Sequence, residues 1–217
     1  MKRPAHLSRC RSLRRAVVGA VAAGCLAVVL APGIASAGVL STVAGILPNC
    51  GPTNASTPFA AWGDTNAYFL MPNGGLESGT AGWTVTNGSV VTGNESFHLN
   101  AKTDTHSLSL AAGGSAVSPT ACVAMGENTV RLLVKSSGVA GSKLHVQAYV
   151  QNALTGLVLS TGFDITGTTS WAPTPRLLIP NLLGGIAGTQ NVHLVFTTSG
   201  RATWNIDDVF IDPLRHR

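Results

Sequence analysis

The stretch that decides the fold is KLHVQAYVQ, residues 143–151. Its apolar side chains occupy every second position from Leu144 to Val150, and the polar positions between them begin at His145. Because side chains alternate between the two faces of a β-strand, this stretch predicts a strand with one face in the core and the other facing water or a ligand. The run TVRLLVK, residues 129–135, has the same alternation and favours the same interpretation.

Further short runs with strand character follow one another along the chain, separated by turn sequences such as Asn87-Gly88 and Gly113-Gly114. No segment has a convincing helical period, and the best helical candidate, Pro180–Gly188, contains adjacent glycines and reads as a loop. This pattern indicates an all-β, two-sheet β-sandwich over residues 66–217. The predicted strands are 68–71, 82–86, 90–92, 107–111, 129–135, 143–151, 157–161, 176–179, 191–198 and 203–211.

The charge of the chain is concentrated at its start. The 217 residues include 14 lysines and arginines against 9 acidic residues, and six of the basic residues but none of the acidic ones fall within residues 1–37. Basic and acidic side chains therefore nearly balance in the rest of the chain. A nearly neutral chain offers no electrostatic footprint for nucleic acid or for an anionic membrane surface, so we expect neither partner.

Residues 1–37 have the three parts of a secretory signal peptide. A basic segment is followed by an apolar stretch from Ala16 to Leu30 and by the small-residue motif Ala35-Ser36-Ala37, which predicts cleavage after Ala37. We expect a secreted, extracellular protein with no membrane association after signal removal. The alternatives are an uncleaved membrane anchor and a lipoprotein at Cys25, and Arg14-Arg15 leaves twin-arginine export open beside general secretion.

Signal removal leaves two cysteines, Cys50 and Cys122. In an oxidising compartment two cysteines favour one intramolecular disulfide, and two free thiols are the alternative. Residues 38–65 are rich in Gly, Pro, Ala, Ser and Thr, which indicates an extended N-terminal arm. We expect Cys50, Phe59 and Trp62 to hold this arm to the domain.

The motifs of several enzyme classes are missing from the sequence. It contains no Gly-x-Ser-x-Gly nucleophile elbow, no His-Glu-x-x-His zinc motif, no phosphate-binding Gly-x-x-x-x-Gly-Lys and no dinucleotide fingerprint. Two carboxylates can still converge in space for glycoside hydrolysis, but nothing in the sequence marks such a pair. We expect a protein without enzymatic activity.

Two motifs lie at opposite ends of the predicted domain: PNGGLESG at residues 72–79, followed by Gly82-Trp83, and WNIDDVFID at residues 204–212. With HSLSL at residues 106–110 between them, they resemble the galactose-binding-like jelly rolls of secreted carbohydrate-binding modules. The resemblance covers about residues 68–212, most of the chain after the predicted signal peptide, and implies a jelly-roll β-sandwich that binds carbohydrate without catalysis. The N-terminal arm is similar instead to uncharacterised exported proteins of high-GC Gram-positive bacteria.

In that family, a glutamate of the first strand and an aspartate of the last strand commonly bind a structural calcium ion. The resemblance implies the same role for Glu77 and for Asp207 or Asp208, and calcium does prefer hard oxygen ligands of this kind. Strand alternation places the two aspartates on opposite faces, so only one is expected to reach the ion, with a preference for Asp208. A metal-free fold in which these acids bind backbone amides is the alternative.

A sugar-binding face is expected on the polar side of residues 143–151, because sugars stack on aromatic rings and hydrogen-bond to amides, arginine and histidine. The candidate ligand-binding residues are Arg131, His145, Gln147, Tyr149 and Trp171. The expected partner is a cell-wall or extracellular glycan. The alternatives are a polar face that is only solvated, and a structural or interaction protein of the cell envelope with no sugar ligand.

Overall fold

The computed structural model describes residues 50, 53–124, 127–180 and 189–213. The predicted signal peptide, residues 1–37, the first part of the predicted arm and most of the predicted loop 180–188 lie outside the described residues. Within the described part, all regular structure is β-strand except one 3-10 helix, η1 (Ala60–Trp62). No helix of this part is long and apolar enough to cross a membrane.

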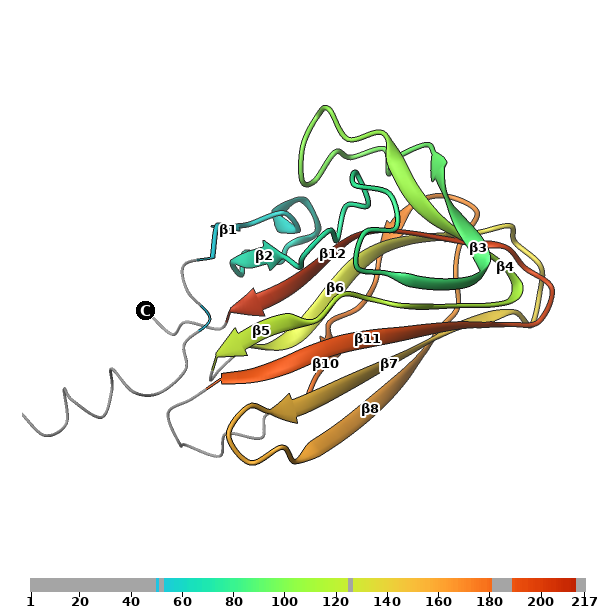
Figure 1. The fold of residues 1–217 in the computed structure, drawn as a ribbon. Helices are drawn as coiled ribbons and strands as arrows, with labels where there is room; N and C mark the ends of the chain where they lie inside the picture. The colour runs from blue at the N-terminus through green and yellow to red at the C-terminus, as the bar shows by residue number, and fades with distance from the viewer. Residues whose placement is uncertain (1–49, 51–52, 125–126, 181–188, 214–217) are drawn as a thin grey trace, which may run out of the picture. The chain divides into compact units, whose positions relative to one another are not determined.

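Twelve strands follow one another along the described residues (Figure 1). They are β1 (Ala55–Ser56), β2 (Tyr68–Leu70), β3 (Thr84–Thr92), β4 (His106–Val117), β5 (Ala121–Ala124), β6 (Glu127–Ser136), β7 (Lys143–Asn152), β8 (Val158–Ile165), β9 (Ala172–Pro173), β10 (Leu177–Leu178), β11 (Thr189–Ser199) and β12 (Trp204–Pro213). Every pairing between them is antiparallel.

One layer of the sandwich is built on β11. This strand pairs with β7 from Gln190 opposite Asn152 to Ser199 opposite Lys143, and β8 pairs with the far side of β7. On its second side β11 pairs with β5 and with the C-terminal end of β4. The layer therefore runs from β8 through β7 and β11 to β5 and β4.

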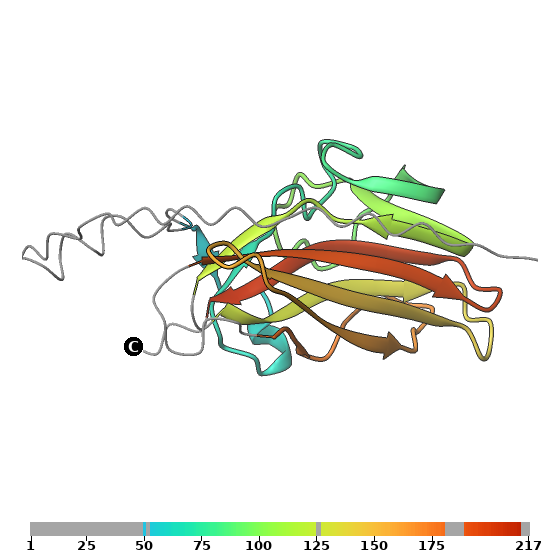
Figure 2. The same ribbon diagram turned by 60° about the horizontal axis from the view of Figure 1, so that its bottom comes forward.

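The second layer is built on β12, which pairs with β6 on one side and with β2 and the first part of β4 on the other. Strand β6 also pairs with the short strands β9 and β10. Strand β4 belongs to both layers, because Leu108 lies opposite Ile206 of β12 whereas Ala116 lies opposite Phe196 of β11. Figure 2 shows the long strands of the two layers running along one common axis.

The main core lies between these layers. It contains Leu144, Val146, Ala148 and Val150 of β7, Val192, Leu194 and Phe196 of β11, Leu132 and Val134 of β6, and Trp204 and Ile206 of β12. The alternation predicted for residues 143–151 is confirmed, since every second side chain of β7 is buried while the others are partly or fully exposed. The predicted all-β sandwich is confirmed as well.

Residues 129–134 of β6 are buried on both faces, which differs from the prediction for residues 129–135. A second apolar cluster of Phe59, Tyr68, Leu133 and Phe210 covers its outer side. Phe59 belongs to the N-terminal arm and is fully buried, with its ring centre 5.0 Å from that of Tyr68 and 5.7 Å from that of Phe210. Alternation tells which face a side chain takes, but a covering segment decides whether that face meets water.

The arm is held to the domain largely as expected. Cys50 forms a disulfide with Cys122 of β5, a strand that the sequence did not predict. Phe59 is the buried anchor, whereas Trp62 is 37% exposed and packs edge-to-face on Phe97, with the two ring centroids 4.8 Å apart.

Two predicted turns lie inside strands. Asn87 sits within β3 at a register shift against β4, and Gly113 sits within β4. Both residues have positive φ, 52° for Asn87 and 72° for Gly113. The turn-forming residues therefore bend two long strands, at the place where β4 passes from one layer to the other, instead of ending them.

Candidate functional site

The polar side of β7 lies open on the outside of the first layer. His145, Gln147 and Tyr149 are partly exposed there, and the strand register brings two further side chains beside them. Asp164 of β8 lies opposite His145, and His193 of β11 lies opposite Tyr149. These five side chains are called the β7 outer face below.

Two rings of the β7 outer face stack on each other. The centroids of Tyr149 and His193 are 5.2 Å apart, and their planes differ by only 9°. Stacking of this kind favours one relative orientation of the two rings. The face therefore carries a preformed, partly exposed ring surface.

A hydrogen-bonded row continues along β7. His145 Nδ1 lies 2.8 Å from Asp164 Oδ1, His145 Nε2 lies 3.1 Å from Gln147 Oε1, and Lys143 Nζ donates to Asp164 Oδ2 at 2.9 Å. The hydrogen bond to Asp164 raises the pKa of His145, and the contact with Gln147 adds to this effect. Gly162 makes room for the row, since a Cβ there would lie 2.6 Å from Gln147 Oε1.

Arg131 is not part of this face, because β6 pairs with β12, β9 and β10 and not with β7. Its Nη1 lies 2.7 Å from Asp64 Oδ2, and its guanidinium carbon lies 4.3 Å from the centre of the Phe59 ring. Asp64 also accepts hydrogen bonds from Arg176 and from the Tyr68 hydroxyl, each at 2.7 Å. The predicted position of Arg131 beside His145 is thus corrected: the side chain is buried in an ion pair with the arm.

Trp171 also lies away from the β7 outer face. It precedes β9, packs against the second apolar cluster, and has Lys135 Nζ 4.9 Å from its ring centre. Of the five predicted ligand-binding residues, the structure brings together His145, Gln147 and Tyr149 and places Arg131 and Trp171 elsewhere.

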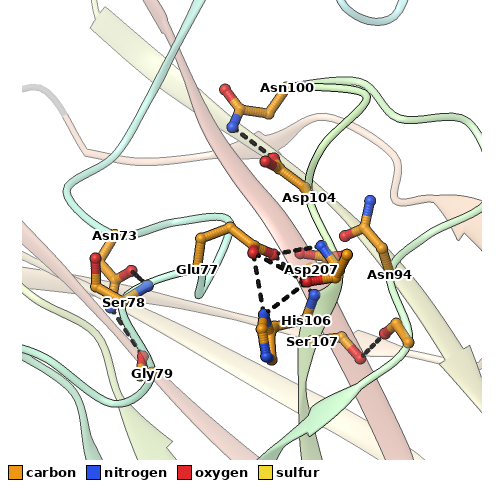
Figure 3. A network of polar contacts seen from close by, with 12 residues as sticks. Asn73, Glu77, Ser78, Gly79, Asn94, Asn100, Asp104, His106, Ser107 and Asp207 are labelled. Carbon is orange, nitrogen blue, oxygen red and sulfur yellow. Dashed lines mark hydrogen bonds and ion pairs between the residues drawn. The ribbon is translucent and has the colours of Figure 1, made fainter.

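Glu77, the first predicted calcium ligand, is bound to the start of β4 (Figure 3). Its Oε1 accepts the amide hydrogens of Thr105 and His106, both at 2.8 Å, and its Oε2 lies 3.0 Å from His106 Nδ1. Burial opposes ionisation, but these hydrogen bonds lower the pKa of Glu77. Among the described residues, no hydrogen bond or ion pair joins Glu77 to Asp207 or Asp208.

A β-bulge interrupts β12 at its two aspartates. The register against β6 shifts between Asp207 and Phe210, and Asp208 has a positive φ of 49°. Both carboxylates are buried against the same loop, where Asp207 Oδ2 accepts the amide hydrogen of Glu95 and Asp208 Oδ2 that of Asn100. Simple alternation does not hold here, because a bulge inserts an extra residue into the strand.

Among the described residues, two buried oxygens of this region have no hydrogen-bond partner, Asp208 Oδ1 and Asn94 Oδ1. A Cβ on Gly75 would lie 3.2 Å from Asp208 Oδ1, and Asn100 Nδ2 donates to Asp104 Oδ2 close by at 2.7 Å (Figure 3). Burial, together with the carboxylates of Glu95 and Asp104, raises the pKa of Asp208 to about 7. A buried oxygen without a partner is costly unless a proton or a cation binds it.

The acidic side chains fit a calcium ion only in part. Within the described residues, no group of three histidine, cysteine or acidic side chains is placed to hold a metal ion. Asp207 uses both oxygens for the amide hydrogens of Glu95 and Asp208, and burial, with the charge of Asp208, raises its pKa to about 8. Asp208 Oδ1, with Asp104 near it, is the hard oxygen that suits a cation.

Four residues of these sites do not follow from the sequence patterns: His193, Asp164, Glu95 and Asp104. The alternation of Val192 and Leu194 marks His193 as outward-facing, but only the register places it beside Tyr149. Asp164 likewise needs the pairing of β8 with β7. Glu95 and Asp104 belong to a loop without a motif, so the sequence holds no signal that joins them to β12.

No family model and no curated protein matches this sequence. Solved structures are similar to it. TmCBM61 in complex with beta-1,4-galactotriose is 16% identical, with a TM-score of 0.45 over 66% of this chain and 97% of that chain. A Family 16 Carbohydrate Binding Module-2 is 17% identical, with a TM-score of 0.45 over 65% and 98%. The Family 11 Carbohydrate-Binding Module from Clostridium thermocellum, in complex with a beta-1,3-1,4-mixed-linked tetrasaccharide, is 13% identical, with a TM-score of 0.42 over 66% and 94%. At these identities the likeness concerns the β-sandwich fold alone.

Proposed function

We propose that the protein is a secreted, non-catalytic carbohydrate-binding module that holds a glycan on the β7 outer face. The observation that carries this proposal is the Tyr149–His193 stack beside the hydrogen-bonded row of His145, Gln147 and Asp164. Ligand sites combine apolar and aromatic surface with a few placed polar groups, and a sugar ring needs both for its C–H surface and its hydroxyl groups. Neighbouring strand positions on this face provide the aromatic rings and the polar groups side by side.

The charges of the β7 outer face favour a neutral glycan. Lys143 and His145 both bind the carboxylate of Asp164, and β7, β8 and β11 contain no other lysine or arginine. A uronic acid or a phosphate is bound best by charge-assisted hydrogen bonds from a free cation. Neutral hydroxyl groups can instead donate to Asp164 and Gln147.

Secretion is part of the same proposal. The signal-like segment 1–37 supports it, and so does the Cys50–Cys122 disulfide, because disulfides persist in oxidising compartments. A cell-wall or extracellular glycan is then the ligand that the protein meets.

The Tyr149→Ala variant is expected to bind the glycan about tenfold more weakly, and His193→Ala by a similar factor, because each removes one ring of the stack. A glycan array with the purified protein selects the ligand, and isothermal titration calorimetry measures its affinity for each variant.

The matched control is Trp62→Ala, which removes a partly exposed aromatic ring far along the chain from β7 and is expected to leave the affinity unchanged. If the array shows no bound glycan, or if Trp62→Ala weakens binding as much as Tyr149→Ala, the β7 outer face is not the binding site.

A second candidate function is a structural or interaction protein of the envelope with no sugar ligand. Exposed apolar side chains at Leu154, Leu157 and Leu159 favour it, since large exposed apolar patches commonly mark interaction sites. An empty glycan array would favour this second candidate.

We also propose that a calcium ion binds at Asp208. The unpartnered, buried Oδ1 of Asp208 and the adjacent side chains of Asp104 and Asn100 support this proposal. Asp208 and Asp104 would hold the ion, and Glu77 is not part of this set because its oxygens bind Thr105 and His106. The ion would supply positive charge between the carboxylate of Asp208 on β12 and that of Asp104 in the loop between β3 and β4, and would hold these two segments together.

Chelation is expected to lower the melting temperature by roughly 5 to 10 °C, because a ligand at a hundredfold excess over its Kd stabilises a fold by about 2.7 kcal/mol. Differential scanning calorimetry with calcium and with EDTA measures the shift. Asp208→Asn should abolish the difference, whereas Glu77→Gln should keep it. Identical melting curves of the wild type with calcium and with EDTA would show that no calcium ion stabilises the fold at Asp208.

A further inference from the structure

Strand β8 forms an edge of the first layer among the described strands. It pairs with β7 along all of its residues, from Val158 opposite Gln151 to Ile165 opposite Leu144, without a register shift. It ends the sheet order, and no other strand of the described residues pairs with it (Figure 1). Within the part of the chain that the structure describes, no strand binds the N–H and C=O groups on its far side, and these groups can pair with a further β-strand.

This edge lacks the features with which proteins usually protect a free strand. Proline, lysine, bulges and inward-pointing charges commonly prevent edge-to-edge pairing. Residues 158–165 contain no proline and no lysine, and their one charged residue, Asp164, is already bound to Lys143 and His145. The edge thus presents neither a backbone obstacle nor an uncompensated charge.

Exposed apolar side chains gather at the start of the same strand. Leu154, Leu157, Val158 and Leu159 are exposed by 72%, 56%, 49% and 45%. Leu159 and the partly buried Phe163 both point to the core side of the sheet, since they lie opposite Val150 and Val146 of β7. A strand added to this edge would cover apolar surface as well as backbone groups.

We propose that β8 of a second copy occupies this edge, antiparallel, about a two-fold axis through Thr161. In this register Leu159 lies opposite the partner's Phe163 on the core side, and Ser160 lies opposite the partner's Gly162 on the outer side, where small residues meet without a clash. All residues from 158 to 164 are paired. The contact is self-complementary, as a two-fold interface requires.

Charge also favours a second copy in this register. Asp164 lies opposite the partner's Val158, and the two Asp164 side chains are six strand positions apart, about 20 Å. Each is compensated by Lys143 and His145 of its own copy, so the pairing brings no like charges together. The only charged side chain of the edge therefore does not oppose dimer formation.

Pairing at β8 would join the two sheets into one. A two-fold axis perpendicular to the sheet keeps both β7 outer faces on the same side, so the dimer would present two glycan sites to one surface. Under the proposed function, this arrangement would raise the avidity for a polymeric glycan without any new contact. The dimer itself does not depend on glycan binding.

Multi-angle light scattering of the purified protein, from micromolar to submillimolar concentration, tests the association. We expect a mass that rises toward twice that of one chain. Leu159→Lys should raise the dissociation constant roughly hundredfold, because it places a charge against the partner's Phe163 twice per dimer. Leu178→Lys is the matched control: Leu178 is 61% exposed on β10, outside this edge, and its replacement should leave the mass unchanged.

Oxidative cross-linking tests the register. Directly opposed residues of antiparallel strands have Cα atoms about 4.5 to 5.5 Å apart, within the range of a disulfide. Thr161→Cys should therefore form a covalent dimer, whereas Ser160→Cys should not, because the partner's Gly162 lies opposite it. A protein that stays monomeric at all concentrations, or a Thr161→Cys variant that does not cross-link, overturns the proposal and leaves this edge to a strand of another protein.

Discussion

Asp64→Asn is expected to lower the free energy of unfolding by about 3 to 5 kcal/mol, because it removes one partner of a buried ion pair. Asp64 is 6% exposed and binds Arg131 and Arg176, each at 2.7 Å, as well as the Tyr68 hydroxyl. Without the carboxylate, the buried guanidinium of Arg131 stays against the Phe59 ring with no charge to balance it. Urea unfolding followed by tryptophan fluorescence measures the loss.

The pH dependence of this effect has a defined sign. Burial opposes ionisation of Asp64, but the hydrogen bonds from Arg176, Tyr68 and Arg131 outweigh it and hold the pKa of Asp64 well below its ordinary value. An acid with a lowered pKa in the folded state stabilises the fold above its unfolded pKa of about 4 and loses this contribution as the pH falls. The stability difference between wild type and Asp64→Asn should therefore be full near neutral pH and shrink in acid.

Asp164→Asn serves as the control for this prediction. It also breaks contacts with two basic side chains, Lys143 and His145, but at a largely exposed position. Exposed ion pairs contribute little to stability, so its unfolding midpoint should stay close to that of the wild type. Equal losses in the two variants, or a loss in Asp64→Asn that grows on acidification, would contradict the role given to the buried ion pair.

Removal of the Cys50–Cys122 disulfide is expected to lower the free energy of unfolding by about 4 kcal/mol, because the bond closes a loop with a sequence separation of 72. The double variant Cys50→Ser/Cys122→Ser, compared with the wild type in urea, measures this loss. Reductant should destabilise the wild type by a similar amount and leave the double variant unchanged. A wild type whose midpoint does not move on reduction would show that the bond does not hold the arm to β5.

Local patterns predicted the sandwich well. The alternation of residues 143–151 identifies β7 and its two faces, and the two cysteines that follow the predicted signal peptide allow only one intramolecular pairing. Local patterns failed where distant segments meet. Arg131 alternates like an outward residue, yet Asp64, 67 positions earlier in the chain, and the Phe59 ring enclose it. The sequence does not tell where the arm folds back.

The candidate sites were predicted in part for the same reason. One strand of the β7 outer face follows from alternation, but the Tyr149–His193 stack depends on the register between β7 and β11. At the aspartates, the bulge after Asp207 changes which way Asp208 faces. A bulge adds one residue without a strong composition signal. Beyond it, the alternation of side chains in the sequence no longer tells which face each residue takes.

Nuclear magnetic resonance mapping with a neutral oligosaccharide selected on a glycan array tests the central claim most directly. We expect the largest chemical-shift changes on the side chains of His145, Tyr149 and His193, with smaller changes along β8. Changes centred instead on Trp62 and Phe97, or on Trp171, would contradict the assignment of the glycan to the β7 outer face.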